Sequence, residues 1–99
     1  MTVRWSPLAI ERVVEIGQWI ALHHPEAAGR IVKGLFSAVE RLADFPESGR
    51  QVPEFERADI REILYRQFRI VYQLRADHVG ILTVRHSLQL MDDADLGER

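Results

Sequence analysis

The sequence predicts an α+β domain of element order β-α-α-β-β-β, in which an N-terminal helical hairpin packs on a small antiparallel sheet. Apolar residues recur at helical spacing as far as Phe45. After the turn-forming segment 45–50, the apolar period falls to about two residues, which is typical of strands. This change of period, together with short links between the later segments, predicts helices first and antiparallel strands afterwards.

The first half of the chain is expected to form a short strand and two helices. The strand covers residues 3–5, and Ser6-Pro7 begins the first helix, because serine caps helices and proline suits the first helical position. This helix extends to about His23, and a second one runs from Pro25 to Phe45. The buried faces of both helices contain apolar residues at helical spacing: Ala9, Val13, Ile16, Ile20, Ile31, Leu35, Val39 and Leu42. The short link predicts an antiparallel pair.

The second half of the chain is expected to form the rest of the sheet. Predicted strands cover residues 60–65, 68–74 and 79–86, with a turn at Ala76-Asp77-His78. No linker or internal repeat divides the chain, so we expect a single domain over residues 1–99. Within it, residues 88–99 are predicted to form a flexible acidic tail.

Composition excludes several classes of protein. Hydrophobic residues make up 46% of the chain, which fits a globular domain, and there is no cysteine to form disulfides or thiolate metal sites. The N-terminus has no apolar leader, and no apolar run approaches the roughly 20 residues that span a bilayer. We therefore expect a cytoplasmic protein with no membrane contact, no metal site and no cofactor. The net charge of −2 argues against direct sequence-specific DNA binding.

Arginines in the predicted sheet are the first candidates for function. Arg61, Arg69 and Arg85 lie in three successive strands, and Arg69 alternates with apolar residues that should face the helices. Arg69 would then point to the open face of the sheet. Such a surface could hold phosphates or the carboxylates of a partner. Equally, it could be an ordinary sheet face with cross-strand arginine–glutamate pairs, for example with Glu62.

Among the histidines, His86 is the candidate for a chemical role, because it ends the last predicted strand directly after Arg85. His23 and His24 instead close the first helix, where a cationic ring suits the dipole. A single histidine at a strand end is more often structural than catalytic. No nucleophile elbow, glycine-rich phosphate loop or metal-binding spacing accompanies it, so no standard enzyme class stands out.

The chain also carries more apolar surface than a domain of this length can bury. The first helix is apolar around much of its circumference, and several strand residues are apolar on more than one face. Residues that we expect to face a partner are Leu8, Trp19, Leu22, Val71, Leu82 and Val84. This excess predicts a partner protein or a homodimer, which fits an interaction protein better than a free-standing enzyme.

Five segments together resemble the ParE/RelE toxin superfamily, and in particular its ParE branch. They follow the order of the family and span nearly the whole chain: Trp5-Ser6-Pro7-Leu8-Ala9, Leu42 to Arg50, Ile60 to Leu64, Phe68 to Tyr72 and Leu82 to His86. The family fold is a helical hairpin on a small antiparallel sheet, which agrees with the element order predicted above.

The resemblance implies the toxin of a type II toxin–antitoxin system, of the kind known as plasmid stabilisation proteins. A ParE-like toxin would inhibit DNA gyrase and form a hetero-oligomer with a cognate ParD-like antitoxin. In that case Arg61, Arg69, Arg85 and His86 are candidates for target contact, and the apolar residues named above would receive the antitoxin. The chain would then be an inhibitor and not an enzyme.

Two alternatives remain. A ribosome-dependent mRNA endoribonuclease of the RelE type would use Arg69, Arg85 and His86 for catalysis. Against this, the segment after His86 reads Ser87-Leu88-Gln89-Leu90-Met91-Asp92, without the tyrosine or the further arginines that a nuclease of this superfamily commonly has. A non-toxic module that only binds the antitoxin is the second alternative.

Overall fold

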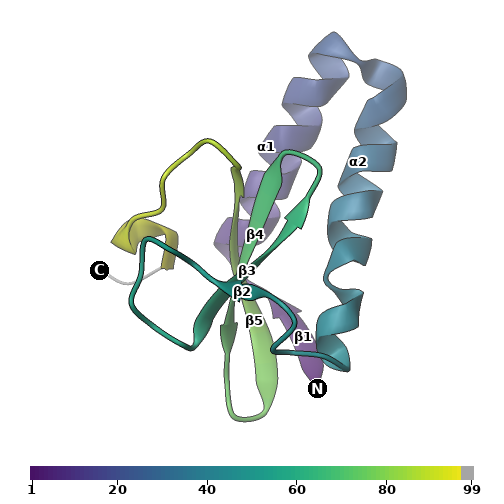
Figure 1. Ribbon diagram of the computed structural model, residues 1–99. Coiled ribbons are helices and arrows are strands. Elements are labelled where there is room, and N and C mark those ends of the chain that lie inside the picture. Colours follow the sequence, from purple (N-terminus) through teal and green to yellow (C-terminus); the bar gives the residue numbers. More distant parts are fainter. Residues whose placement is uncertain (97–99) are drawn as a thin grey trace.

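The computed structural model describes residues 1–96 and shows two helices on one face of a five-stranded sheet (Figure 1). Strand β1 (Thr2–Trp5) leads into α1 (Pro7–His23), α2 (Pro25–Ala38) and the 3-10 turn η1 (Glu40–Ala43). The remaining strands are β2 (Arg50–Gln51), β3 (Ile60–Tyr65), β4 (Phe68–Leu74) and β5 (His78–His86), followed by the 3-10 turn η2 (Asp93–Leu96). The predicted α+β class, with a helical hairpin before the sheet, is confirmed.

The sheet has the order β1-β5-β4-β3-β2 and is mixed. Strands β3, β4 and β5 pair antiparallel, as their short links predicted. In contrast, β1 runs parallel to β5, with Thr2 opposite His78 and Trp5 opposite Ile81. No tight turn joins β1 to its neighbour, so link length gave no guide to its direction. Strand β2, which was not predicted, has only two residues and therefore no alternation to detect.

Ser6 both starts α1 and ties it to the sheet. Its hydroxyl accepts a hydrogen bond from the Ala9 amide at 3.1 Å and donates one to the Leu82 carbonyl at 2.9 Å. The Ser6 amide also donates to the Ile81 carbonyl at 2.9 Å. The predicted N-cap is therefore present, and the same residue links the beginning of α1 to β5.

The second helix ends earlier than the sequence predicted. The α-helix stops at Ala38, and the chain continues through η1, where the Leu42 amide donates to the Val39 carbonyl at 3.0 Å. In a 3-10 turn, residues three apart lie on the same face. Val39 and Leu42 are accordingly both buried, so the apolar stripe continues although the α-helix does not.

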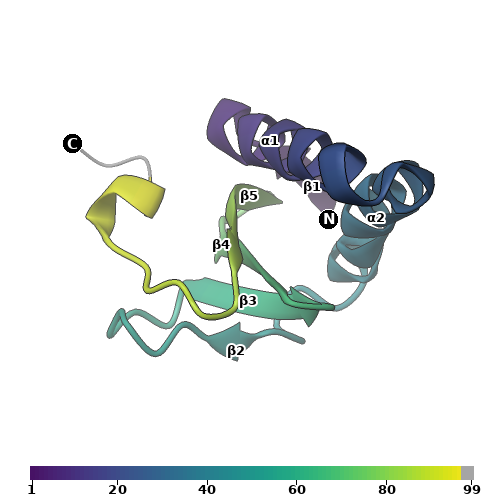
Figure 2. The same cartoon turned by 90° about the horizontal axis from the view of Figure 1, so that it is seen from above.

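The sheet separates two apolar cores, with the helices on one side and the C-terminal segment on the other (Figure 2). The core beneath the helices contains alternate strand residues such as Ile70 and Tyr72. The second core lies on the opposite face and will be called the outer core; its buried members are Val52, Ile60, Val71, Met91 and Leu96. Both faces of the sheet are therefore covered, the outer one by the loop before β3 and by the C-terminal segment.

A β-bulge in β5 changes which residues face each core. Val71 pairs with Thr83 but its neighbour Tyr72 pairs with Ile81, which leaves Leu82 as the extra residue. Ile81 and Val84 consequently both face the helix-side core, although three positions separate them.

Among residues 1–96, no helix is both long and apolar enough to cross a bilayer.

Candidate functional site

Arg69 lies at the centre of a buried ionic network on the outer face of the sheet. Its Nε donates to the Glu62 Oε1 at 2.6 Å, and its two terminal nitrogens donate to the two Glu54 oxygens at 2.7 and 2.8 Å. Nη1 also donates to the Gln89 carbonyl at 3.0 Å. Glu62 accepts a further hydrogen bond from the Arg50 Nε at 2.7 Å. The sequence left open whether Arg69 faces a partner or pairs with a glutamate of the neighbouring strand. The structure shows the pair with Glu62.

The electrostatics follow from this geometry. Arg69 is only 5% exposed and Glu62 only 1% exposed, so each needs a partner of opposite charge. The bidentate hydrogen bonds from Arg69 lower the pKa of Glu54 to about 2, against the opposing effect of burial. The hydrogen bond to Glu54, reinforced by Glu62, raises the pKa of Arg69. Glu54 and Arg69 therefore both stay charged at neutral pH.

Arg85 belongs to a second ionic cluster beside the first. Arg85 is opposite Arg69 in the register of β4 and β5. Its Nε lies 3.5 Å from the Asp95 Oδ1, and the Arg12 Nη2 approaches the same oxygen at 3.6 Å. The Asp95 side chain is 2% exposed, and its other oxygen accepts from the Asp92 amide at 3.0 Å. A carboxylate from η2 thus lies between arginines of α1 and β5.

The C-terminal segment covers this arginine face. Met91 and Leu96 are buried in the outer core, and the Met91 amide donates to Glu54 at 2.9 Å. The Arg85 Nη2 donates to the Leu90 carbonyl at 3.4 Å. Within residues 88–96 of the predicted tail, the side chains of Met91, Asp95 and Leu96 are therefore buried against the outer face, and residues 97–99 lie outside the described residues. The prediction that this tail is flexible remains a prediction.

The other two predicted contact residues lie away from this face. Arg61 is opposite Tyr72, which faces the helix-side core, and its Nη1 donates to the Gly49 carbonyl at 3.0 Å. His86 is opposite Phe68, another member of that core, and the two rings meet edge to face at 6.2 Å. The structure therefore brings Arg69 and Arg85 together but places Arg61 and His86 on the opposite side of the sheet.

His86 instead lines a groove of about 570 Å³ between α1 and the β4–β5 strands. The apolar part of the groove comes from Ile16, Trp19 and Phe68, and its polar part from Glu15, Gln67, His86 and Gln89. The His86 Nδ1 accepts from the Leu88 amide at 3.1 Å, so a neutral ring carries its proton on Nε2. The ring is thus held by the backbone at the start of the C-terminal segment.

The apolar residues predicted to face a partner divide into exposed and buried groups. Trp19 and Leu22 are exposed on α1, at 62% and 81%, and Leu8 on the same helix is half-buried. Leu82 is half-buried against the outer core. Val71 and Val84 are buried within the two cores of the chain itself. Pattern alone could not separate these groups, because it did not reveal the C-terminal cover or the bulge.

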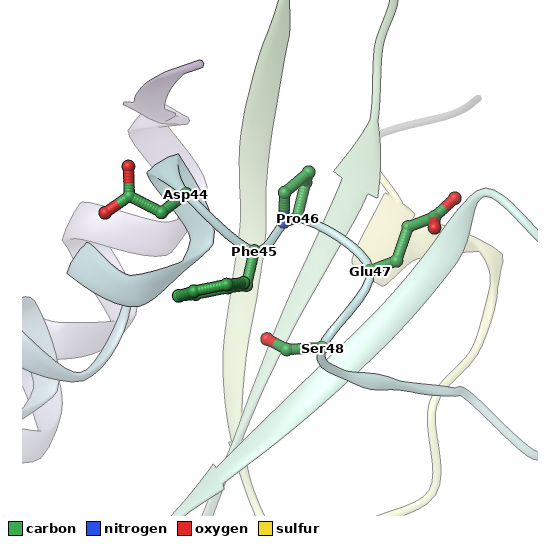
Figure 3. Close-up of a pocket in the computed structure, with 5 residues that line it drawn as sticks. All are labelled: Asp44, Phe45, Pro46, Glu47 and Ser48. Atoms are coloured by element: carbon green, nitrogen blue, oxygen red, sulfur yellow. The ribbon is translucent and has the colours of Figure 1, made fainter.

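A second hollow, of about 410 Å³, is formed by residues 44–48 (Figure 3). The Phe45 ring and the Ser48 side chain turn toward one another, whereas the carboxylates of Asp44 and Glu47 are directed away from them. Next to this turn, the Tyr72 hydroxyl donates to the Pro46 carbonyl at 2.7 Å and accepts from the Gly49 amide at 2.9 Å. No set of reactive groups converges here, and the hollow is a local feature of the turn.

Gly49 is required where this turn meets the sheet. A Cβ at that position would lie 2.5 Å from the Glu62 carbonyl oxygen, which is backbone and cannot move aside cheaply. The sequence segment that carried part of the family resemblance therefore has a steric reason for its glycine.

Within residues 1–96, no group of three or more histidine, aspartate or glutamate side chains could hold a metal ion.

Comparison with known proteins agrees with this fold. Residues 3–91 match the family described as the ParE toxin of type II toxin-antitoxin system, parDE. The chain is 39% identical over 92 residues to the protein named "Putative toxin Y4kP" of Sinorhizobium fredii (strain NBRC 101917 / NGR234), covering 88% of each chain. A solved structure titled "Chromosomal ParDE TA system from P. aeruginosa" superposes with a TM-score of 0.75 at 21% identity, over 87% of this chain and 95% of that one.

The fold and the sequence match define the class, a toxin component of type II toxin–antitoxin systems. Within that class, the chain belongs to the ParE toxin family.

Proposed function

We propose that this chain inhibits DNA gyrase in the bacterial cytoplasm and is neutralised by a cognate ParD-like antitoxin with which it forms a hetero-oligomer. Membership of the ParE family supports the choice of target and partner. Between gyrase inhibition and cleavage of mRNA, the state of Arg69 is the observation that favours inhibition.

An arginine that stabilises a scissile phosphate must present free N–H groups to it. The nitrogens of Arg69 donate to Glu54, Glu62 and Gln89, and the side chain is only 5% exposed. His86, the histidine that the nuclease alternative would use for acid–base catalysis, lies on the other side of the sheet. The three residues that a nuclease would use therefore do not surround one open position.

Target contact is assigned to residues whose side chains remain accessible. Arg61, Arg85 and His86 are each half-buried, so part of each side chain can meet a partner. Arg69 contributes indirectly, because it holds the loop around Glu54 and the C-terminal segment in place. Antitoxin contact is assigned to the exposed side of α1, where Trp19 and Leu22 provide apolar area next to the groove that contains His86.

The first test is induced expression of the full chain without an antitoxin, with DNA breaks and translation followed in the same cells. Gyrase inhibition predicts filamentation and DNA damage while translation continues. Purified chain should also inhibit supercoiling by gyrase. Rapid arrest of translation with intact DNA would replace the proposal with an mRNA endoribonuclease, and normal growth would leave a non-toxic binding module.

The antitoxin surface can be tested separately with Leu22→Asp. Because this leucine is 81% exposed, the substitution should leave the fold and the toxicity unchanged but weaken neutralisation by the antitoxin. Phe45→Asp is a matched control, since Phe45 is also exposed but lies in the turn beyond η1. Equal loss of neutralisation in both variants would contradict the assignment to α1.

A further inference from the structure

The outer face of the sheet has a small hollow at the end where β1, β5 and β4 meet. Its volume is about 190 Å³, and its lining includes Arg4, Gln73, Arg75, His78 and Gly80. Val79 and Ile81 are buried in the helix-side core, so His78 and Gly80, which alternate with them, face the other way. Arg4 is opposite Gly80 in the register and lies between Val3 and Trp5, which pack on the helix side.

The floor of the hollow is open because of Gly80. A Cβ built at Gly80 would meet only the His78 Nε2, at 3.9 Å. Any other residue here would project a side chain into the space between the arginines. The glycine thus lets a ligand approach the backbone of β5 closely.

The cations around the hollow are not neutralised as those near Glu54 are. The side chains of Arg4 and Arg75 form no hydrogen bond or ion pair with any of the described residues 1–96, although the Arg75 backbone amide donates to the His78 carbonyl at 2.9 Å. Both are exposed. The carboxylate of Asp59, close to Gln73, is already bound by Arg57 and Gln73. Two guanidinium groups therefore have their donors available to an anion.

His78 adds a third nitrogen. Its Nδ1 lies 2.7 Å from the Asp77 Oδ1, and because a carboxylate only accepts, Nδ1 carries the proton. The other nitrogen, Nε2, is the atom that faces Gly80; in the neutral ring it accepts a hydrogen bond, for example from a P–OH group, and it donates to an anion only when the ring is protonated. The hydrogen bond from His78 lowers the pKa of Asp77, and the charge of Arg4 contributes in the same direction. Asp77 is 76% exposed, so water screens its charge from the hollow.

We propose that this hollow, formed by Arg4, Arg75, His78 and Gly80, binds a single phosphate group. Its volume of about 190 Å³ is below the range of pockets that enclose a whole small molecule, so it fits one charged group of a larger ligand or a free ion. Guanidinium forks match the oxygens of phosphate in pairs, and donors arriving from separate strands suit a tetrahedral anion better than a planar carboxylate.

The phosphate can come from a nucleic-acid backbone or from a small phosphate compound, and both offer the same oxygens to the arginines. The site does not depend on the proposed inhibition of gyrase. It uses none of the residues assigned there to target or antitoxin contact. With a net charge of −2 for the whole chain, the attraction is local and should weaken as salt is added.

The test is a titration of the full-length chain with inorganic phosphate, followed by the backbone amide resonances of Arg4, Arg75, His78 and Gly80. Saturable shifts confined to these positions are expected in the natural chain. Arg75→Ala and Arg4→Ala should each raise the dissociation constant about tenfold, as expected for the loss of one charge-assisted contact. Arg30→Ala, which removes another exposed arginine, in α2, should leave the dissociation constant unchanged.

Gly80→Val keeps the proposal testable if an arginine variant fails to fold. Nothing but the His78 Nε2 lies within 4 Å of the added Cβ, so the strand should accept valine, and valine should abolish phosphate binding without changing the charge. A short DNA duplex that produces the same shifts, in competition with phosphate, would identify nucleic acid as the source. Shifts with phosphate but not with the duplex would identify a small phosphate compound.

Unchanged resonances with both probes would overturn the site. So would shifts that persist in Gly80→Val, or a response to a polyglutamate peptide in the absence of any response to phosphate.

Discussion

Two groups of arginines lie at opposite ends of the outer face of the sheet, and they differ in what surrounds them. Arg69 and Arg85 are covered by the C-terminal segment and bound by the carboxylates of Glu54, Glu62 and Asp95. Arg4 and Arg75 flank an open hollow and meet no partner among the described residues. Arg69, which the sequence singled out, therefore has its donors used within the molecule and Arg85 has part of its side chain covered, whereas the side chains of Arg4 and Arg75 are available.

The difference shows that residue type and strand position do not settle the role of a charged side chain. Arg69 was expected on an open face, and it does face away from the helices. That face is covered by chain segments whose carboxylates are close to the arginine, so its donors are used within the molecule. Accessibility of the donors, and not the number of arginines, distinguishes a ligand site from an internal ion pair.

The largest expected effect comes from removing the central charge of the covered group. Arg69→Ala leaves Glu62 buried, with Arg50 as its remaining charged partner, and should lower the free energy of unfolding by about 3–5 kcal/mol. Urea denaturation measures this loss. Arg75→Ala, its counterpart in the open hollow, should change stability by less than about 0.5 kcal/mol. Equal losses would remove the distinction between the two groups.

The covered group should also make stability depend on acid. The pKa of Glu54 is lowered to about 2 in the folded chain, so its carboxylate stabilises the fold above its unfolded pKa of about 4.5 and loses that effect as pH falls toward 2. Glu54→Gln should remove up to about 3 kcal/mol at pH 7 and flatten the decline in stability below pH 5.

Denaturation midpoints measured from pH 7 down to pH 2 would show this effect. Asp59, whose pKa is also lowered to about 2, titrates in the same window but is more exposed, so Asp59→Asn should alter the slope less. A larger change with Asp59→Asn would mean that the ionic network at Arg69 is not the main source of acid sensitivity.

The C-terminal cover can be tested through its apolar anchor. Met91 is 6% exposed in the outer core, and Met91→Ala should cost about 2 kcal/mol and raise hydrogen exchange at the amides beneath it. Leu90→Ala is a suitable control, because the neighbouring leucine is 77% exposed and should cost almost nothing. If both substitutions are neutral, the segment does not hold the arginine face closed in solution.

The smallest effect is expected at the floor of the open hollow. Gly80→Val should raise the melting temperature slightly, by an amount equivalent to about 0.5–1 kcal/mol, because glycine weakens a strand and the added side chain meets only one atom within 4 Å. Thermal unfolding provides the measurement. A marked loss of stability would show that the space above Gly80 is occupied in the folded chain.

Much of the fold follows directly from local pattern. The N-cap at Ser6, the break at Pro25 and the alternation from Phe68 to Leu74 each correspond to an element boundary or to a face in the structure. Features set by long-range contact were not predictable in this way. The parallel pairing of β1 with β5 and the bulge at Leu82 depend on segments far apart in sequence, and neither leaves a local signal.

The candidate site was predicted less well for the same reason. Glu62 was foreseen as a partner for Arg69 because cross-strand pairing brings adjacent strands together. Glu54 and Asp95 belong to a loop and to the C-terminal segment, and no periodicity predicts where such segments fold back. The sequence pattern does not indicate a role for Arg4 or Arg75, because both lie near strand ends, where exposed arginines are common.

The hydroxyl of Ser6 has a consequence for how the protein is made. It donates a hydrogen bond to the Leu82 carbonyl, 76 positions later, and β5 is the one strand with which β1 pairs among residues 1–96. During translation β1 can already meet Phe36 and Ala43, but it has no strand partner among the described residues until β5 (His78–His86) has left the ribosome. Contacts this distant in sequence slow folding, because a long loop must close first. Strand β1 accordingly joins the sheet only after β5, the last of the described strands in the chain, has been synthesised.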